Sequence, residues 1–362
     1  MIPVYRPALD EKETAYVLEA MNSSWISSRG EFLDRFERGF ADFVGARYGV
    51  ATCNGTVSLH LILAALGLGP GDEVIVPTFT YVASVNAITY TGASPVFVDS
   101  HLDYWNLDPD RVREAVGPRT RAILAVHLYG HPADMEPLEK IAAEHGLHLV
   151  EDAAEAHGAE YMGRRVGPLG VAGSFSFFGN KVITTGEGGM VVTDNEAFAE
   201  RCRHLRGQGV SPTRTYWHDA VGFNYRMTNL AAAVGVAQLS KIDAILARKR
   251  EIADAYARGL GTVPGVTLQP EMSWARNVFW MYSILVDPIE RDELMVHLRD
   301  HGVDSRPFFH PAHTLPMYRV ADGSYPVAER LGASGINLPS FPDLTASEIE
   351  EVCAAVQGFF AR

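Results

Sequence analysis

The sequence has few cysteines and little positive charge. Its 362 residues include only three cysteines, Cys53, Cys202 and Cys353, which are far apart and form no Cys-x-x-Cys pair. Isolated cysteines in an odd number argue against a disulfide framework and against a zinc cluster. With 31 Lys and Arg against 44 Asp and Glu, the formal net charge is −13. Because no run of four basic residues offsets this charge, we expect no binding to nucleic acid or anionic membranes.

The chain also lacks a long hydrophobic run. No stretch approaches the roughly 18 apolar residues that a transmembrane helix needs. The first residues do not show a basic segment followed by an apolar one, which is the pattern of a secretory signal. We therefore expect a cytoplasmic protein without membrane contact. An apolar fraction of 47% is nevertheless sufficient for a substantial hydrophobic core.

Several common catalytic and nucleotide-binding motifs are missing. The P-loop pattern is absent, which excludes that class of ATPase. Gly67–Gly71 is rich in glycine but precedes a predicted strand instead of a helix, so a dinucleotide-binding fingerprint is not supported. Neither Gly-x-Ser-x-Gly nor His-Glu-x-x-His occurs. Because a proline interrupts the pair His310 and His313 and no acidic residue is near in sequence, we expect no bound metal.

Short strands and helices alternate between about residues 45 and 195. Helical patterns such as Val57–Leu66 and Met135–His145 lie between runs rich in β-branched or aromatic residues. This alternation predicts an α/β fold, with a mostly parallel sheet covered by helices on both faces. The predicted strands are Glu73–Pro77, Pro95–Asp99, Ala122–Val126, Leu147–Asp152, Ser174–Phe178 and Gly189–Thr193.

The pattern changes in the last third of the chain. Residues 229–258 have long helical periodicity, which ends where glycine and proline appear from Gly259 onward. A strand-like run follows at Phe279–Val286. We therefore predict a large α/β domain with an N-terminal arm at residues 1–245 and a smaller α+β domain at residues 246–362.

Three segments of the α/β region carry residues that suit one site. Cys53–Thr56 precedes an apolar helix, where glycine and free N–H groups suit a phosphate; the alternative is that Thr56 only caps the helix. Asp152 ends a predicted parallel strand, where α/β folds bind ligands, although such a residue by itself is more often a helix cap or a surface residue. Lys181 follows an aromatic run, and it is either an exposed cation or a buried nucleophile with a lowered pKa. Phosphate donors, a carboxylate and a buried amine are together what a pyridoxal phosphate (PLP) enzyme needs.

Seven segments in the same order resemble the DegT/DnrJ group of PLP-dependent nucleotide-sugar aminotransferases. The resemblance covers nearly the whole chain and implies a fold-type I enzyme related to aspartate aminotransferase. Such an enzyme has a mostly parallel central sheet, a smaller α+β C-terminal domain, and two active sites at the interface of a homodimer. The segments are Cys53–Thr56, Val76–Ser84, Val126–Gly130, Glu151–Gly158, Ser174–Lys181, Thr185–Gly189 and Asn224–Asn229.

The resemblance also implies roles for individual residues. Lys181 corresponds to the Schiff-base lysine, Asp152 to the partner of the pyridine nitrogen, and Tyr81 to the residue that stacks on the ring, unless Tyr81 is part of the core. Glu155 stands next to the ring hydroxyl, where much of the family has glutamine, so we expect it to be protonated or compensated by a protonated imine. The implied phosphate ligands are Gly55, Thr56 and Ser176 in one subunit and Asn224 and Arg226 in the other. A purely structural role of Arg226 is the alternative.

Five further segments resemble a branch of this family that forms GDP-perosamine. They are Ser24–Glu31, Arg206–Gly209, Tyr216–Asp219, Arg306–Tyr318 and Gly335–Pro342. This resemblance implies transfer of the amino group of L-glutamate to C4 of GDP-4-keto-6-deoxy-D-mannose. The residues expected to bind the nucleotide sugar are Ser27, Arg29, Arg214, His218, Arg306, His310 and His313, with His313 as the hexose contact. Each of them alone is equally well explained as a surface residue.

Three other functions differ from this one in what they require. Base recognition depends on backbone geometry, so a UDP- or dTDP-linked keto-sugar is an open alternative as the acceptor. A related branch dehydrates a keto-sugar at C3, but it has histidine where Lys181 stands. A non-catalytic scaffold would have lost the lysine, the aspartate or the phosphate segment, and all three are present. The sequence therefore favours a PLP-dependent transaminase.

Overall fold

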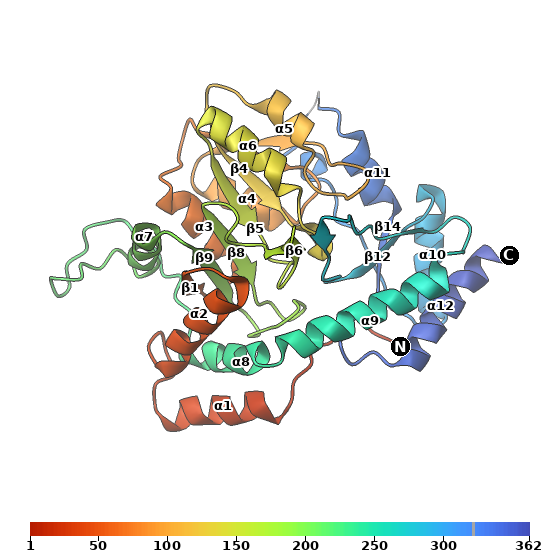
Figure 1. Ribbon diagram of the computed structural model, residues 1–362, viewed down its shortest axis with the longest axis horizontal. Helices are drawn as coiled ribbons and strands as arrows, with labels where there is room; N and C mark the ends of the chain where they lie inside the picture. The colour runs from red at the N-terminus through yellow and green to blue at the C-terminus, as the bar shows by residue number, and fades with distance from the viewer. Residues whose placement is uncertain (321–322) are drawn as a thin grey trace.

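A seven-stranded sheet forms the centre of the protein (Figure 1). The computed structural model describes residues 1–320 and 323–362. The strand order is β1-β9-β8-β5-β4-β2-β3, and only β9 runs opposite to the others. The strands are β1 (Tyr48–Thr52), β2 (Glu73–Pro77), β3 (Ser94–Val98), β4 (Thr120–Val126), β5 (His148–Asp152), β8 (Ala172–Ser176) and β9 (Gly189–Thr193).

The predicted α/β sheet is present, and the six predicted strands match observed strands within two residues. The seventh strand, β1, was not predicted. It pairs with β9, about 140 residues later in the chain, in the register Val50 to Val191. Such a partner is not visible in a local pattern, and Gly49 and Ala51 interrupt the β-branched pattern by which the other strands were predicted.

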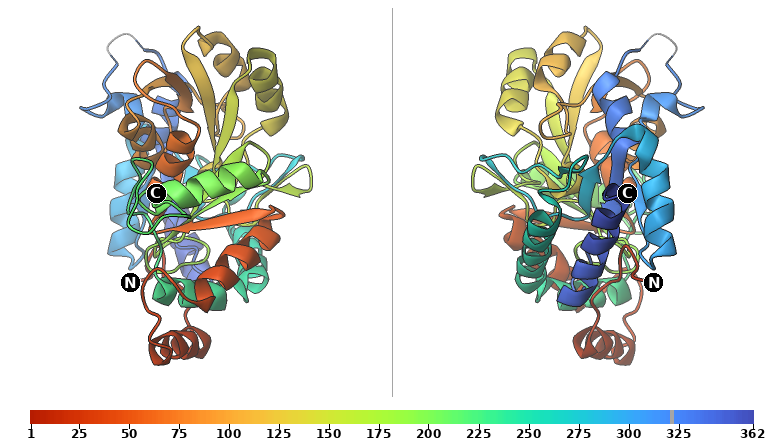
Figure 2. Two further views of the ribbon diagram at one scale, coloured as in Figure 1. Left: turned by 90° about the vertical axis from the view of Figure 1, so that its left-hand side faces the viewer. Right: turned by 90° about the vertical axis from the view of Figure 1, so that its right-hand side faces the viewer.

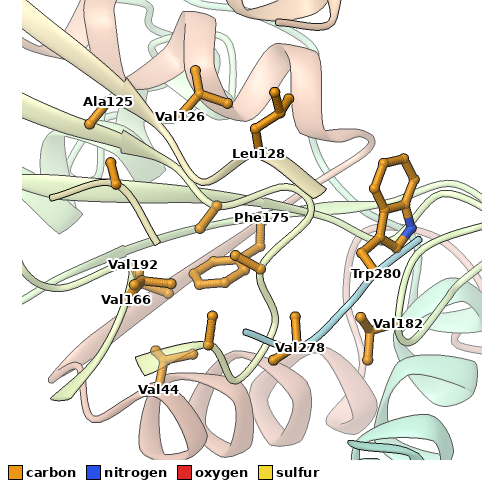
Figure 3. Packing of buried hydrophobic residues seen from close by; sticks show 14 of the residues in the cluster. Val44, Ala125, Val126, Leu128, Val166, Phe175, Val182, Val192, Val278 and Trp280 are labelled. Atoms are coloured by element: carbon orange, nitrogen blue, oxygen red, sulfur yellow. The ribbon is translucent and has the colours of Figure 1, made fainter. Parts of the chain in front are cut away.

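Helices cover both faces of the sheet, because successive strand side chains point to opposite sides. On one face Val74 and Val191 pack with α3, α4 and α7; on the other Ile75 and Val192 pack with α2, α6 and α8. Figure 3 shows the second of these cores, in which Phe175 lies among Val44, Val166 and Val192. The helices to this point are α1 (Glu11–Asn22), α2 (Glu31–Val44), α3 (Gly55–Ala65), α4 (Val82–Tyr90), α5 (Pro109–Ala115), α6 (Met135–His145), α7 (Glu196–Arg206) and α8 (Asn229–Leu239).

A second sheet with its own core follows α8. Its strand order is β10-β12-β14-β13, and we call it the C-terminal sheet. Its strands are β10 (Thr267–Leu268), β12 (Tyr282–Leu285), β13 (Arg306–Pro307) and β14 (Gly335–Leu338). The helices here are α9 (Ile242–Leu260), α10 (Pro288–Asp300), α11 (Pro326–Ser334) and α12 (Ala346–Phe360). A small third sheet joins β6 (Glu160–Tyr161), β7 (Arg164–Arg165) and β11 (Ala275–Arg276).

The predicted domain boundary between residues 245 and 246 falls within α9. Ile245 packs in the core of the large sheet, whereas Ile252 and Tyr256 pack in the core of the C-terminal sheet. The first residues of the chain reach the same place, since Ile2 also packs in this second core. Both termini accordingly lie near α9, α10 and α12, and α1 lies apart from them against α8 (Figures 1 and 2).

Membrane-spanning helices were not expected. No single helix among the described residues is long and apolar enough to cross a membrane. Only α8 and α9 taken together, which meet at an angle of 59°, reach the necessary length and apolar content.

Candidate active site

A cavity of about 560 Å³ lies at the carboxyl ends of the central parallel strands. Val126, Asp152 and Ser176, the last residues of β4, β5 and β8, form its floor, and Trp280 and Phe309 form one wall. This is where open α/β sheets bind ligands. Of the nine predicted cofactor residues, those that line the cavity are Gly55, Thr56, Tyr81, Asp152, Glu155, Ser176 and Lys181.

One end of the cavity is the start of α3. Asn54 caps this helix by accepting a hydrogen bond from the N–H of Val57 at 3.0 Å. The alternative that Thr56 is the cap is therefore wrong: Thr56 lies in the first turn and lines the cavity. A Cβ atom on Gly55 would lie 2.6 Å from Cβ of Ser176, so only glycine lets this turn approach β8. Free N–H groups and the helix dipole favour an anion here.

Asp152 brings a carboxylate into the same cavity. Its Oδ2 accepts a hydrogen bond from the Ser84 hydroxyl at 2.7 Å, and its Oδ1 accepts one from the N–H of Ala154 at 3.1 Å. Burial raises the pKa of Asp152, while these two hydrogen bonds lower it. A cationic partner in the cavity would stabilise the ionised form of this buried carboxylate.

Lys181 and Glu155 face each other in this cavity. Lys181 Nζ lies 3.5 Å from Glu155 Oε1, and Glu155 Oε2 accepts the N–H of Tyr129 at 2.8 Å. Burial lowers the pKa of Lys181, although the carboxylates of Glu155 and Asp152 oppose this shift. Burial also raises the pKa of Glu155 to about 7, which Lys181 partly offsets. The Lys181 side chain is thus largely buried, with 11% of it exposed, and the expected state of Glu155, protonated or compensated by a protonated imine, stays a prediction.

An aromatic wall that the sequence did not indicate encloses Lys181. Lys181 Nζ lies 3.9 Å from the centroid of the Trp280 ring, and the Trp280 indole N–H donates to the Asn180 carbonyl at 2.6 Å. Tyr129 stacks between Trp280 and Phe309, with centroid distances of 6.1 and 5.3 Å. Tyr129 has φ +51°, a left-handed conformation that aims its N–H at Glu155. The wall joins segments some 150 residues apart, which a local motif cannot reveal.

A buried pair behind the floor supports β5. His127 Nε2 lies 3.0 Å from Glu151 Oε2, and both side chains are inaccessible to solvent. Glu151 also accepts the N–H groups of Gly167 and Gly170, both at 2.7 Å, so all of its polar atoms are bonded. The backbone N–H of His127 donates to the Asp152 carbonyl at 3.0 Å. This network fixes the position of Asp152, although Glu151 itself does not line the cavity.

Two of the nine predicted cofactor residues, Asn224 and Arg226, do not line the cavity, and Tyr81 lies at its edge. Tyr81 begins α4 at the mouth of the cavity, where 56% of it is exposed; the alternative that it is a core residue is wrong. Asn224 and Arg226 lie outside the cavity of their own chain, and Arg226 donates to the Asn224 side chain at 2.9 Å. Both residues lie next to the start of α3, because the carbonyl of Tyr225, which stands between them, accepts the N–H of Cys53.

The predicted sugar-binding residues do not converge in a single chain. Arg29 lines a separate cleft of about 620 Å³ together with Arg226, and Ser27 is exposed nearby. Arg214 and His218 are exposed on the loop that projects beyond α7 (Figure 1). Their roles in substrate binding stay predictions, which depend on where a second chain would lie.

The three predicted residues of the C-terminal part also lie outside the cavity lining. Arg306 is exposed and pairs with Asp304 at 3.1 Å, and His310 is exposed beside Phe309. His313 is buried, and its ring nitrogens contact the Thr78 hydroxyl at 2.7 Å and Glu329 at 3.2 Å. Because both nitrogens are engaged, the single chain offers no free polar atom of His313 to a hexose. Phe309, not singled out before, lines the cavity instead.

We expect replacement of Glu155 by glutamine to change the pH dependence of stability. The pKa of Glu155 is about 7 in the folded protein and near 4.5 in the unfolded chain. Ionisation of this carboxyl group therefore lowers the free energy of unfolding as the pH rises between these two values. Without cofactor, Glu155→Gln should therefore gain in melting temperature over the wild type between pH 4.5 and 7, with a constant difference above. Thermal unfolding across this pH range measures it. A difference that stays constant throughout would contradict the raised pKa of Glu155.

The residues present fit PLP. A buried carboxylate, an amine with a lowered pKa and a glycine-start helix lie at separate points of one cavity. PLP has a cationic ring nitrogen, an aldehyde and a phosphate, and the carboxylate, the amine and the helix start offer a partner to each of these groups in turn. Within the described residues, no three His, Cys, Asp or Glu side chains gather so as to hold a metal ion.

Comparison with known proteins agrees with this geometry. The profile of the DegT/DnrJ/EryC1/StrS aminotransferase family matches residues 7–357. The chain is 48% identical to GDP-perosamine synthase of Escherichia coli O157:H7 and 47% identical to that of Caulobacter vibrioides, with 99% and 98% of this chain covered and 99% and 97% of theirs. Its fold matches the crystal structure of Streptomyces venezuelae DesV in complex with a ketimine intermediate, with a TM-score of 0.94, 38% identity and 99% of both chains covered.

These comparisons confirm four predictions made from the sequence. They are the family, the fold-type I architecture, the aminotransferase class and the dependence on PLP. The roles of the individual residues stay predictions, and the geometry described above supports them.

Proposed function

The chain belongs to the DegT/DnrJ/EryC1/StrS family of PLP-dependent aminotransferases, and we propose that it transfers the amino group of L-glutamate to C4 of GDP-4-keto-6-deoxy-D-mannose. The products are GDP-perosamine and 2-oxoglutarate, and we place the reaction in the cytoplasm. The observation that carries this function is the meeting of Lys181, Asp152 and the start of α3 in one cavity. Full-length similarity to relatives named GDP-perosamine synthase supports the choice of sugar.

Different residues of the cavity would bind the ring nitrogen, bind the phosphate and transfer the proton. PLP, when bound, supplies an aldehyde that condenses with amines and a ring that accepts electrons from a breaking C–H bond. Asp152 would hold the protonated ring nitrogen, and the first turn of α3 with Ser176 would hold the phosphate. Because burial lowers its pKa, the Lys181 amine is able to accept the proton from Cα of glutamate and to deliver a proton to C4 of the sugar. Trp280 and Phe309, which line the cavity, would limit the access of water to this transfer.

The acceptor sugar is tested directly with a panel of substrates. The purified enzyme is incubated with PLP, glutamate and the GDP-, UDP- or dTDP-linked 4-keto-6-deoxy sugar, and the mass of each product is measured. We expect the GDP-linked ketone to be converted to the amine with the highest kcat/KM. Faster turnover of the UDP or dTDP sugar would overturn the perosamine assignment and leave the aminotransferase class intact.

We further propose a homodimer in which Asn224 and Arg226 complete the phosphate site of the partner. Both lie outside the cavity of their own chain, although arginine and phosphate form strong charge-assisted hydrogen bonds. Large apolar side chains are exposed on α1, on the turn that follows it and on the 207–224 loop, and exposed apolar surface of this kind is typical of an interface. These side chains are Leu18, Met21, Trp25, Ile26, Val210, Tyr216, Trp217 and Val221.

Mixing two inactive variants tests whether the sites are shared. Lys181→Ala and Arg226→Ala are each expected to be inactive, whereas the mixed dimer has one intact site. If subunits reassociate at random, half of the dimers are mixed, so about a quarter of the wild-type activity should return.

A surface variant tests the interface itself. Val221→Asp should sediment as a monomer and be inactive, while Ile289→Asp, at a similarly exposed position on α10, should remain a dimer. A mixture that stays inactive, or an active monomer, would contradict the shared site.

A further inference from the structure

The N-terminal segment Ile2–Ala8 runs from the C-terminal sheet to the turn that carries Lys181. At its beginning, the N–H of Ile2 donates to the Gly302 carbonyl at 2.7 Å, and the Ile2 carbonyl accepts the N–H of Asp304 at 2.9 Å. This part of the segment is paired like a short parallel strand and packs in the second core. Its beginning is therefore fixed to the C-terminal part of the protein.

The rest of the segment reaches both ends of the Lys181–Thr184 turn. The hydroxyl of Tyr5 donates to the backbone carbonyl of Lys181. Gln238 of α8 connects the segment to the other end: its Nε2 donates to the Ala8 carbonyl at 2.8 Å, and its Oε1 accepts the N–H of Thr184 at 3.2 Å. The segment thus holds the turn directly at one end and through one side chain at the other.

The contact of Tyr5 has no substitute in the described part of the chain. No other donor among residues 1–320 and 323–362 reaches the Lys181 carbonyl. Burial raises the pKa of Tyr5, so its hydroxyl stays protonated and remains a donor over the whole working pH range. A buried carbonyl that loses its donor is costly, and the local backbone moves to find another.

We propose that Ile2–Ala8 is a strap that positions the catalytic lysine, with Tyr5 as its positioning residue. The proposal rests on the function proposed above for Lys181. A lysine side chain has several rotatable bonds, so the place of its Nζ between Glu155 and Trp280 depends on a fixed backbone. Small displacements of a reacting group reduce rates strongly. Because the strap also holds the C-terminal part, it fixes Lys181 relative to the wall formed by Trp280.

The variant Tyr5→Phe removes the hydroxyl and keeps the ring. The matched control is Tyr256→Phe, which removes another buried tyrosine hydroxyl that donates to a backbone carbonyl, that of Pro339 at 2.8 Å, far from the turn in sequence and outside the cavity lining. Two quantities are measured. The first is hydrogen–deuterium exchange of the peptide covering residues 181–185 in the protein without cofactor. The second is the rate at which saturating glutamate bleaches the visible band of the PLP-loaded enzyme.

In Tyr5→Phe we expect faster exchange in this peptide and a rate about tenfold lower, with unchanged PLP affinity. Tyr256→Phe should change neither quantity. Unchanged exchange in Tyr5→Phe would overturn the strap, and faster exchange with an unchanged rate would overturn its role in positioning. If glutamate bleaches no band in the wild type, the proposed function fails instead, and the exchange measurement still decides whether the strap holds the turn.

Discussion

The variant Lys181→Ala should bind PLP and lose its turnover. The cofactor would keep its proposed phosphate site at α3 and its proposed carboxylate partner Asp152, whereas the lysine amine that lines the cavity is removed. Because proton transfer by a positioned side chain contributes about 10² to 10⁴ in rate, and the covalent step is lost as well, we expect a fall of at least about 10³-fold. Steady-state kinetics and the stoichiometry of bound PLP measure the two effects.

A further variant separates proton transfer by the Lys181 amine from the effect of its positive charge, and a control variant removes a lysine elsewhere. Lys181→Arg keeps a cation beside Glu155, but a guanidinium stays protonated and is unable to accept a proton at neutral pH. We expect it to be as inactive as the alanine variant. Lys140→Ala removes an exposed lysine on α6 and should retain full activity. Normal turnover in either Lys181 variant would refute the role of this residue.

Replacement of Asp152 by asparagine should reduce activity and increase the stability of the protein without cofactor. An amide keeps the size of the side chain but is unable to hold a proton on the ring nitrogen by charge. Losing one partner of a buried charged pair costs about 3 kcal/mol, which corresponds to a fall of about 10²-fold in rate. Burial raises the folded-state pKa of Asp152, so its ionised form destabilises the fold at neutral pH and asparagine removes this cost.

Asp99→Asn is the matched control for this variant. Asp99 also follows a strand of the central sheet and is buried, but it accepts the N–H groups of Val327 and Ala328 at the start of α11, at 3.1 and 2.8 Å. Removal of this charge should lower the melting temperature and leave kcat unchanged. Equal activity of Asp152→Asn and wild type, with PLP bound, would contradict the assignment of Asp152.

Local signals were sufficient for the residues that a single element positions. Asp152 ends an apolar strand and Lys181 follows another, so strand direction alone brings them to one edge of the sheet. The helix cap shows the limit of this approach. Asn54 and Thr56 are both good caps two residues apart, and only the backbone conformation of Asn54 decides between them.

The parts of the site that depend on distant contacts were not predictable. Trp280 and Phe309 reach the cavity from beyond α9, and the strap comes from the other end of the chain. The motif around Val76–Ser84 contained Ser84, but nothing in it indicated a hydrogen bond to Asp152 across 68 residues. The placement of Arg29 and Arg226 in a separate cleft is of another kind, since the second subunit of the proposed homodimer would decide what faces it.

The most direct test of the central claim is the first half of the reaction, measured without any sugar. PLP-loaded protein is mixed with excess L-glutamate, and the visible absorbance and the 2-oxoglutarate released are recorded together. We expect the band to disappear with about one 2-oxoglutarate formed per site, and Lys181→Ala to form none on the same timescale. If wild-type protein with bound PLP releases no 2-oxoglutarate, the cavity around Lys181 is not the site of a glutamate-dependent aminotransferase.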